Sequence, residues 1–146
     1  MILGEAELEA WGEHIGATVT TPVFIALSGD LGAGKSVLAR AIARGAGVTA
    51  TMPSPTFNLV FRYDGTRATV AHLDLYRLEH EQDVWELGWR ELGDGNEIVL
   101  VEWPERAASL LPPDRWDIRI DVATSDTRAV TLSVRGNAPQ VPEAVA

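Results

Sequence analysis

The chain contains no cysteine, which excludes disulfides, thiolate nucleophiles and thiolate metal sites. No apolar run approaches the roughly 18 residues that a membrane-spanning helix needs. The first residues, MILGEAELEAWGEHIG, also lack the basic start and apolar stretch of a secretory signal. We therefore expect a cytoplasmic protein that makes no membrane contact.

Basic residues are scarce, because 12 Lys and Arg stand against 21 Asp and Glu, for a formal net charge of −9. Nucleic-acid binding depends largely on neutralising phosphates, so this balance argues against a chain that grips RNA or DNA by itself. Any role with nucleic acid is expected to be indirect. The rest of the composition, 46% hydrophobic and 23% charged, is ordinary for a globular protein, and 146 residues allow one domain with one core.

Hydrophobic spacing predicts an α/β fold: a single domain over 1–136 with a central mixed sheet, helices on both faces and a C-terminal hairpin. The residues from 137 to 146 show no periodicity, and we expect them to form a disordered tail. Helices are predicted around Leu8, Trp11 and Ile15, for about three turns from Ser36, at 79–92 and at 104–111; strands are predicted at 23–27, 58–63, 67–76, 97–102, 116–122 and 129–134.

The segment GDLGAGKS holds the strongest motif of the sequence. Gly29, Gly34, Lys35 and Ser36 fit the phosphate-loop pattern G-x-x-x-x-G-K-[ST] in full, between a predicted strand and a predicted helix. Glycines let backbone N–H groups turn toward phosphates, and the helix N-terminus adds partial positive charge. The lysine then reaches the β- and γ-phosphates and the hydroxyl binds Mg²⁺. This pattern predicts a nucleotide site in a single P-loop NTPase-like domain.

Two carboxylates complete the predicted site, since Asp74 and Glu102 each end an apolar strand. We predict Lys35, Asp74 and Glu102 as catalytic residues, and Ser36 and Glu102 as Mg²⁺ ligands. The strand before Glu102 is the more continuously apolar and so the more central, which favours Glu102 for the metal and leaves Asp74 to orient water or act as base. The sequence leaves the reverse assignment open.

The remaining predicted contacts to nucleotide come from the glycine loop and from the segment after the following helix. Thr56 lies in a proline-rich loop that either folds over the γ-phosphate or satisfies its own backbone. The side chain of Asp30 is interpreted as a structural turn acid. His14, His72 and His80 show no ligand spacing and are read as structural. The predicted ATP-contacting residues are Asp30, Gly32, Ala33, Gly34, Lys35, Ser36, Val37 and Thr56.

Four motifs in fixed order, GDLGAGKS, SPTF, HLDLYRLE and LVEWPER, resemble the TsaE (YjeE) family of bacterial ATPases. Ser36 stands where many relatives have threonine, and either hydroxyl binds Mg²⁺. The resemblance implies ATP and Mg²⁺ as cofactors, with Lys35, Ser36, Asp74 and Glu102 in the family's motif positions. It implies slow ATP hydrolysis and an accessory role, with the TsaD and TsaB proteins, in N6-threonylcarbamoylation of adenosine 37 in tRNA. Contact with tRNA would then be indirect, through that complex.

Two other functions remain open at this point. One is a small-molecule kinase built on the same loop, although the sequence offers little of the arginine-rich lid that such an enzyme needs. The other is a nucleotide-sensing interaction module in which Asp74 and Glu102 hold metal without useful turnover. Phosphate release, with and without acceptors, would separate these alternatives.

Overall fold

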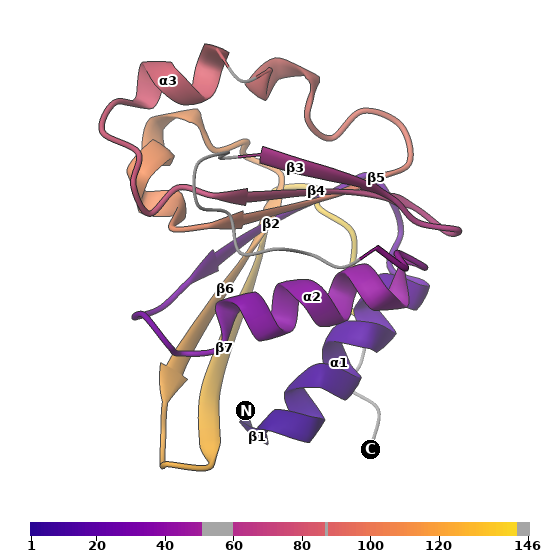
Figure 1. Ribbon diagram of the computed structural model, residues 1–146, viewed down its shortest axis with the longest axis vertical. Helices are drawn as coiled ribbons and strands as arrows, with labels where there is room; N and C mark the ends of the chain where they lie inside the picture. Colours follow the sequence, from indigo (N-terminus) through magenta and orange to yellow (C-terminus); the bar gives the residue numbers. More distant parts are fainter. Residues whose placement is uncertain (51–59, 87, 143–146) are drawn as a thin grey trace.

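A seven-stranded sheet with the order β1-β7-β6-β2-β5-β4-β3 runs through the computed structural model, which describes residues 1–50, 60–86 and 88–142 (Figure 1). Four strands are parallel to one another: β2 (Val23–Ser28), β4 (Thr69–Asp74), β5 (Glu97–Glu102) and β6 (Arg115–Val122). Three run antiparallel to their neighbours: β1 (Ile2–Gly4), β3 (Val60–Asp64) and β7 (Thr127–Arg135). The predicted α/β domain with a mixed sheet and a C-terminal hairpin, β6–β7, is confirmed.

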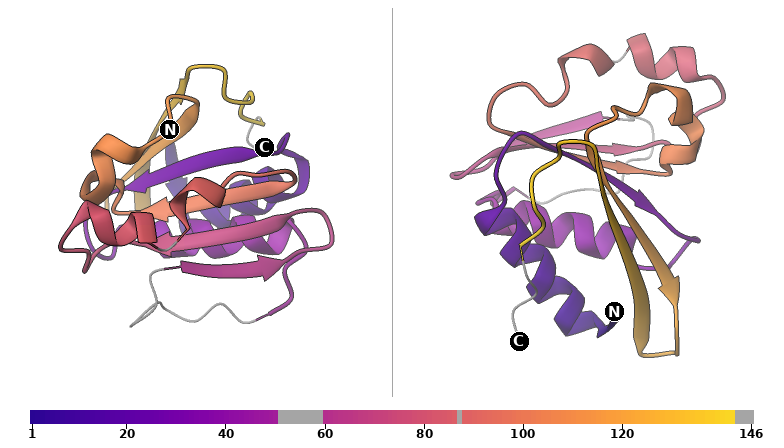
Figure 2. Two further views of the ribbon diagram at one scale, coloured as in Figure 1. Left: turned by 90° about the horizontal axis from the view of Figure 1, so that it is seen from above. Right: turned by 180° about the vertical axis from the view of Figure 1, so that it is seen from behind.

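Helical elements cover both faces of the sheet, as predicted. The helices α1 (Glu5–Thr18) and α2 (Lys35–Gly45) lie on one face; α3 (Glu81–Glu86) and the 3₁₀ helices η1 (Trp89–Glu91) and η2 (Pro104–Leu110) lie on the other. Figure 2 shows the same layers from above and from behind. Since the central strands are covered on both sides, β5 is buried along its whole length, which explains the apolar run IVLV between its two terminal glutamates.

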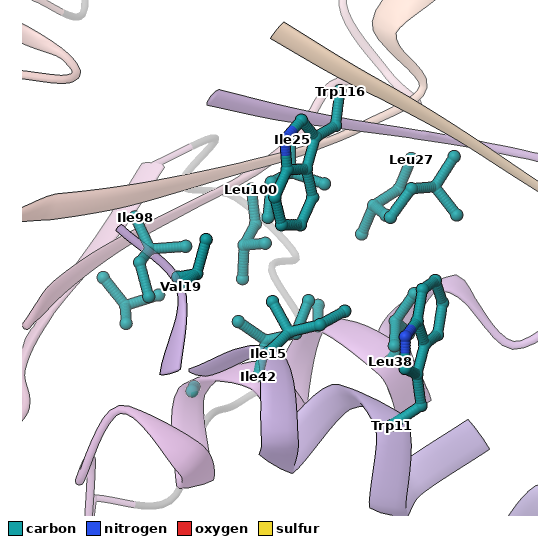
Figure 3. Close-up of a cluster of buried hydrophobic side chains, with 14 of the residues drawn as sticks. Trp11, Ile15, Val19, Ile25, Leu27, Leu38, Ile42, Ile98, Leu100 and Trp116 are labelled. Carbon is teal, nitrogen blue, oxygen red and sulfur yellow. The ribbon is translucent and has the colours of Figure 1, made fainter. Parts of the chain in front are cut away.

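The larger core lies between the sheet and the helix pair α1–α2 (Figure 3). Trp11 and Ile15 of α1 meet Ile42 of α2 beneath the sheet residues Ile25 and Leu100. The two helices pack closely because α1 carries glycine at the crossing. A Cβ built on Gly16 would lie 1.9 Å from the carbonyl oxygen of Ile42, so a larger side chain does not fit there.

The structure differs from the prediction in the segment between β4 and β5. The helix predicted over 79–92 is instead the short α3 followed by η1, with Gly88 between them at φ 86°, a left-handed conformation that ends helices. Leu87 lies outside the described residues. The helix predicted at 104–111 is the 3₁₀ element η2, interrupted at Ala107 (φ −131°, ψ 37°). The helical structure of both segments is therefore shorter and less regular than hydrophobic spacing suggested.

The segment predicted as a disordered tail makes contacts where the structure describes it, over 137–142. The indole N–H of Trp116 donates to the carbonyl of Pro139 at 2.7 Å. Ala138 and Val141 are partly buried against the larger core. The start of this segment therefore differs from a free tail, because a buried tryptophan finds its hydrogen-bond acceptor there.

Among the described residues, no helix combines the length and the apolar character needed to cross a membrane.

The strand β1 was not predicted. It has only three residues, and it pairs with the start of β7.

Candidate nucleotide-binding site

The glycine loop joins the end of β2 to the start of α2, as the motif predicts. Gly29, Gly32 and Gly34 all have positive φ, at 143°, 77° and 114°. A Cβ on Gly29 would lie 2.2 Å from the carbonyl oxygen of Ile120, whereas a Cβ on Gly32 would meet nothing within 4 Å. Glycine is thus needed at Gly29 for close backbone packing, while Gly32 leaves open space over the loop where a phosphate can approach the backbone.

Lys35 opens α2 and turns its side chain back over the loop. Lys35 is 5% exposed, and its ammonium donates to the carbonyls of Gly29 and Asp30, the second at 3.3 Å. The same ammonium lies 3.7 Å from the centre of the Trp103 ring, within reach of a cation–π interaction. Burial lowers the pKa of Lys35, and the negative charge of Glu102 opposes that shift.

The Ser36 hydroxyl lies next to the Glu102 carboxylate, donating at 3.0 Å to Oε1 and 3.3 Å to Oε2. The register explains this contact, since β5 pairs directly with β2 and places Glu102 beside Leu27, close to the start of the loop. No group of three or more His, Cys, Asp or Glu side chains arranged for a metal occurs within the described part of the chain. A hydroxyl and a carboxylate beside a phosphate loop nevertheless fit Mg²⁺, which takes few protein oxygens and completes its shell with phosphate and water.

Asp74 ends β4 opposite Glu102 in the parallel register. Its Oδ1 accepts a hydrogen bond from the Tyr76 backbone N–H at 3.1 Å, which fixes the carboxylate at the strand end. Burial raises the pKa of Asp74; the Tyr76 hydrogen bond opposes this shift, and the charge of Glu102 adds to it. A raised pKa moves a carboxylate toward the range in which it accepts a proton usefully.

One cavity of about 210 Å³ joins these residues. Asp30 and Ala33 do not line it: the Asp30 carbonyl accepts from Lys35, and Ala33 is buried, with its carbonyl accepting from Arg128. Thr56 lies outside the described residues, as do Ser54 and the rest of 51–59. The cavity is lined by the predicted site residues Gly32, Gly34, Lys35, Ser36, Val37, Asp74 and Glu102, together with Leu31 and Trp103.

Comparison with known proteins agrees with this geometry. The family model of threonylcarbamoyl adenosine biosynthesis protein TsaE matches residues 3–130. The chain belongs to the TsaE family. It is 37% identical to the tRNA threonylcarbamoyladenosine biosynthesis protein TsaE of Bacillus subtilis over 113 residues, which are 77% of this chain and 70% of the relative. It is 34% identical to the Treponema pallidum protein of the same name over 123 residues, which are 84% of this chain and 90% of the relative.

The fold comparison finds a solved structure with the same fold. A crystal structure of Bacillus subtilis YdiB superposes with a TM-score of 0.76 at 28% identity, and the match covers 94% of this chain and 85% of that one. The resemblance drawn from the four sequence motifs is therefore confirmed over most of the chain.

Sequence reasoning missed two features of this TsaE family member. His72, interpreted from the sequence only as structural, is buried, and its Nε2 lies 2.5 Å from Oε2 of Glu102. Its position two residues before Asp74, on the same face of β4, was the available signal. The second feature is a neighbouring cavity of about 280 Å³, which shares Gly32, Gly34 and Val37 with the first; its other lining residues are Glu5, Leu8, Ser125, Asp126 and Arg128.

Proposed function

We propose that the chain is a Mg²⁺-dependent ATPase that takes part in tRNA threonylcarbamoyladenosine biosynthesis. In this role it hydrolyses ATP slowly by itself and acts as an accessory to the TsaD and TsaB proteins. The observation that carries the ATPase proposal is the meeting of Lys35, Ser36, Asp74 and Glu102 at one cavity beside a complete phosphate loop. The pathway and the tRNA substrate are inferred from the names of the family and of its relatives.

Each side chain has a separate task in this proposal. The loop N–H groups and the Lys35 ammonium bind the β- and γ-phosphates and offset their charge. Ser36 and Glu102 hold Mg²⁺, which when bound neutralises charge on the phosphate oxygens. Asp74 orients the attacking water and accepts its proton, and burial raises the pKa of its carboxyl group.

The nucleoside is proposed to occupy the neighbouring cavity. This cavity continues from the same glycines and has an apolar wall at Leu8 together with polar groups at Ser125, Asp126 and Arg128. The Arg128 guanidinium is held in place because its Nε donates to the Ala33 carbonyl at 2.9 Å. A slot that combines an apolar wall with a few fixed polar groups suits a base and ribose.

The accessory role is supported by charge. With a net charge of −9, the chain offers little attraction to an RNA backbone, so tRNA is expected to be reached through partners. Slow turnover follows if the chain alone lacks the added positive charge that an arginine finger supplies, an effect of about 10³ to 10⁵ in rate.

The test is phosphate release from ATP by the purified chain at about 0.15 M salt, alone and with TsaD and TsaB, together with tRNA retention. Slow hydrolysis alone, faster hydrolysis with partners and weak tRNA retention are expected. Asp74→Asn should reduce turnover, and Asp94→Asn, which changes an exposed acid outside the cavity, serves as its matched control. Transfer of phosphate to a small acceptor would favour a kinase, and ATP binding without turnover under any condition would favour a sensing module.

A further inference from the structure

The Glu102 carboxylate has a second buried neighbour besides Ser36. The His72 imidazole approaches it from β4, with Nε2 2.5 Å from Oε2, while the Ser36 hydroxyl approaches from α2 at 3.0 Å from Oε1. His72 and Glu102 are each only 2% exposed. One carboxylate is therefore held from two sides by groups on two different elements.

The strand register produces this arrangement. His72 pairs with Leu100, and Asp74 pairs with Glu102, so His72 and Glu102 are diagonal neighbours on one face of the β4–β5 pair. That face carries Val70 and Leu100 into the core beneath α2, whereas Leu73 points to the opposite core. His72 thus occupies a core position that an apolar residue would fill equally well if packing were its only task.

The ring of His72 has a single polar partner among the described residues. Its Nδ1 is buried without a hydrogen-bond partner, so every polar contact of the imidazole goes to Glu102. A carboxylate accepts hydrogen bonds only, so the contact assigns the proton to Nε2. A buried histidine nitrogen without a hydrogen-bond partner lowers the stability of the fold, so packing alone does not account for a histidine at this position.

We propose that His72 is a positioning residue: it holds the Glu102 carboxylate turned toward Ser36 and so sets the affinity of the nucleotide complex for Mg²⁺. This inference rests on the proposed function of the site. His72 touches neither nucleotide nor metal, and it acts only through Glu102. Loss of a hydrogen-bonding partner behind a metal ligand typically costs about 10- to 100-fold in metal affinity, and we expect an effect of that size.

The test measures ATP binding, so it does not depend on turnover. The dissociation constant of ATP is determined by calorimetry in EDTA and again in saturating Mg²⁺, for the wild-type chain and for three variants. His72→Phe keeps a ring and removes the donor, and His72→Gln keeps an amide N–H that reaches about as far as Nε2. Val70→Ala is the matched control, because it truncates a fully buried residue on the same face of the same strand.

We expect His72→Phe to bind ATP in EDTA like the wild type and to lose 10-fold or more of the gain that Mg²⁺ brings. His72→Gln should recover most of that gain, and Val70→Ala should keep all of it. A full Mg²⁺ gain in His72→Phe overturns the inference, as does an equal loss in Val70→Ala or an equal loss with and without Mg²⁺. His72→Leu replaces the phenylalanine variant if the latter does not fold.

The same experiment separates this inference from the proposed function. If the wild-type chain bound ATP no better with Mg²⁺ than without it, the proposed Mg²⁺ site would fail, and the role of His72 would fail with it. If the wild-type chain showed the gain and His72→Phe kept it, the site would stand and only the role of His72 would be overturned.

Discussion

Replacing Lys35 by methionine separates phosphate binding from folding, because methionine keeps an unbranched apolar stem and removes only the ammonium. In the nucleotide complex the ammonium is expected to contact phosphate oxygens, and hydrogen bonds to charged groups contribute about 1.5 to 3 kcal/mol. At about 1.4 kcal/mol per tenfold, Lys35→Met should weaken ATP binding about 10- to 150-fold.

Folding should respond differently to the same substitution. The ammonium is nearly buried, and its bonds to the Gly29 and Asp30 carbonyls offset the cost of removing its charge from water. Methionine removes the cost of burying the charge, but it also leaves the carbonyl of the buried Gly29 without its donor. We therefore expect the free energy of unfolding to fall by no more than about 2 kcal/mol. Calorimetric titration with ATP and urea denaturation of the same preparation measure the two effects. Unchanged ATP affinity would refute the phosphate-loop assignment, and a large fall in stability would refute the reasoning about burial.

A chemical test is available as well, because Lys35 is the only lysine in the chain. An amine-reactive reagent therefore has one side-chain target, besides the N-terminus. Burial lowers the pKa of this amine, which increases its neutral, reactive fraction at a given pH. ATP should protect Lys35 from modification, as read by mass spectrometry of the peptide that contains it, while the N-terminus serves as the internal control.

Three further predictions concern the site and the core. Glu102→Gln should reduce the Mg²⁺ dependence of ATP binding, whereas Asp74→Asn should leave binding intact and slow hydrolysis at saturating ATP; the opposite pattern in calorimetry and phosphate release would exchange the two roles. Gly16→Ala should lower the free energy of unfolding by about 1 to 3 kcal/mol in urea, because its methyl group would overlap a carbonyl of α2. Deletion from Asn137 onward should lower stability by about 1 to 3 kcal/mol, because it leaves the buried Trp116 indole N–H without its acceptor; an unchanged melting temperature would contradict this docking.

Local patterns predicted the parts of this molecule that local physics controls. The phosphate loop could be read from the sequence because glycines, lysine and hydroxyl must stand at fixed spacing between a strand and a helix. The central place of β5 could be read because a strand covered on both faces needs apolar residues at every position. These two inferences were enough to bring Ser36 and Glu102 toward the same end of the sheet.

Contacts between residues on different strands could not be predicted from such local sequence patterns. The proximity of His72 to Glu102 depends on β4 pairing with β5 in one particular register, and a shift by one residue would turn His72 to the other face. Hydrophobic spacing over 79–92 also did not show that Gly88 would adopt the left-handed conformation that separates α3 from η1. The role predicted for Thr56 stays a prediction, since that residue lies outside the described part of the chain.

Trp103 shows how the site combines local strain with tertiary contact. It is the one non-glycine with positive φ within the described residues, at φ 58° and ψ 51°, and such a conformation costs on the order of 1 to 3 kcal/mol. The strained turn comes directly after Glu102 and sends the chain from β5 into η2. It also sets the indole 3.7 Å from the Lys35 ammonium and 4.9 Å from the Tyr76 ring. Since Tyr76 follows β4 and Lys35 follows β2, one tryptophan links the segments after three adjacent strands, and these contacts offset the strain at the position where the proposed metal ligand must be held.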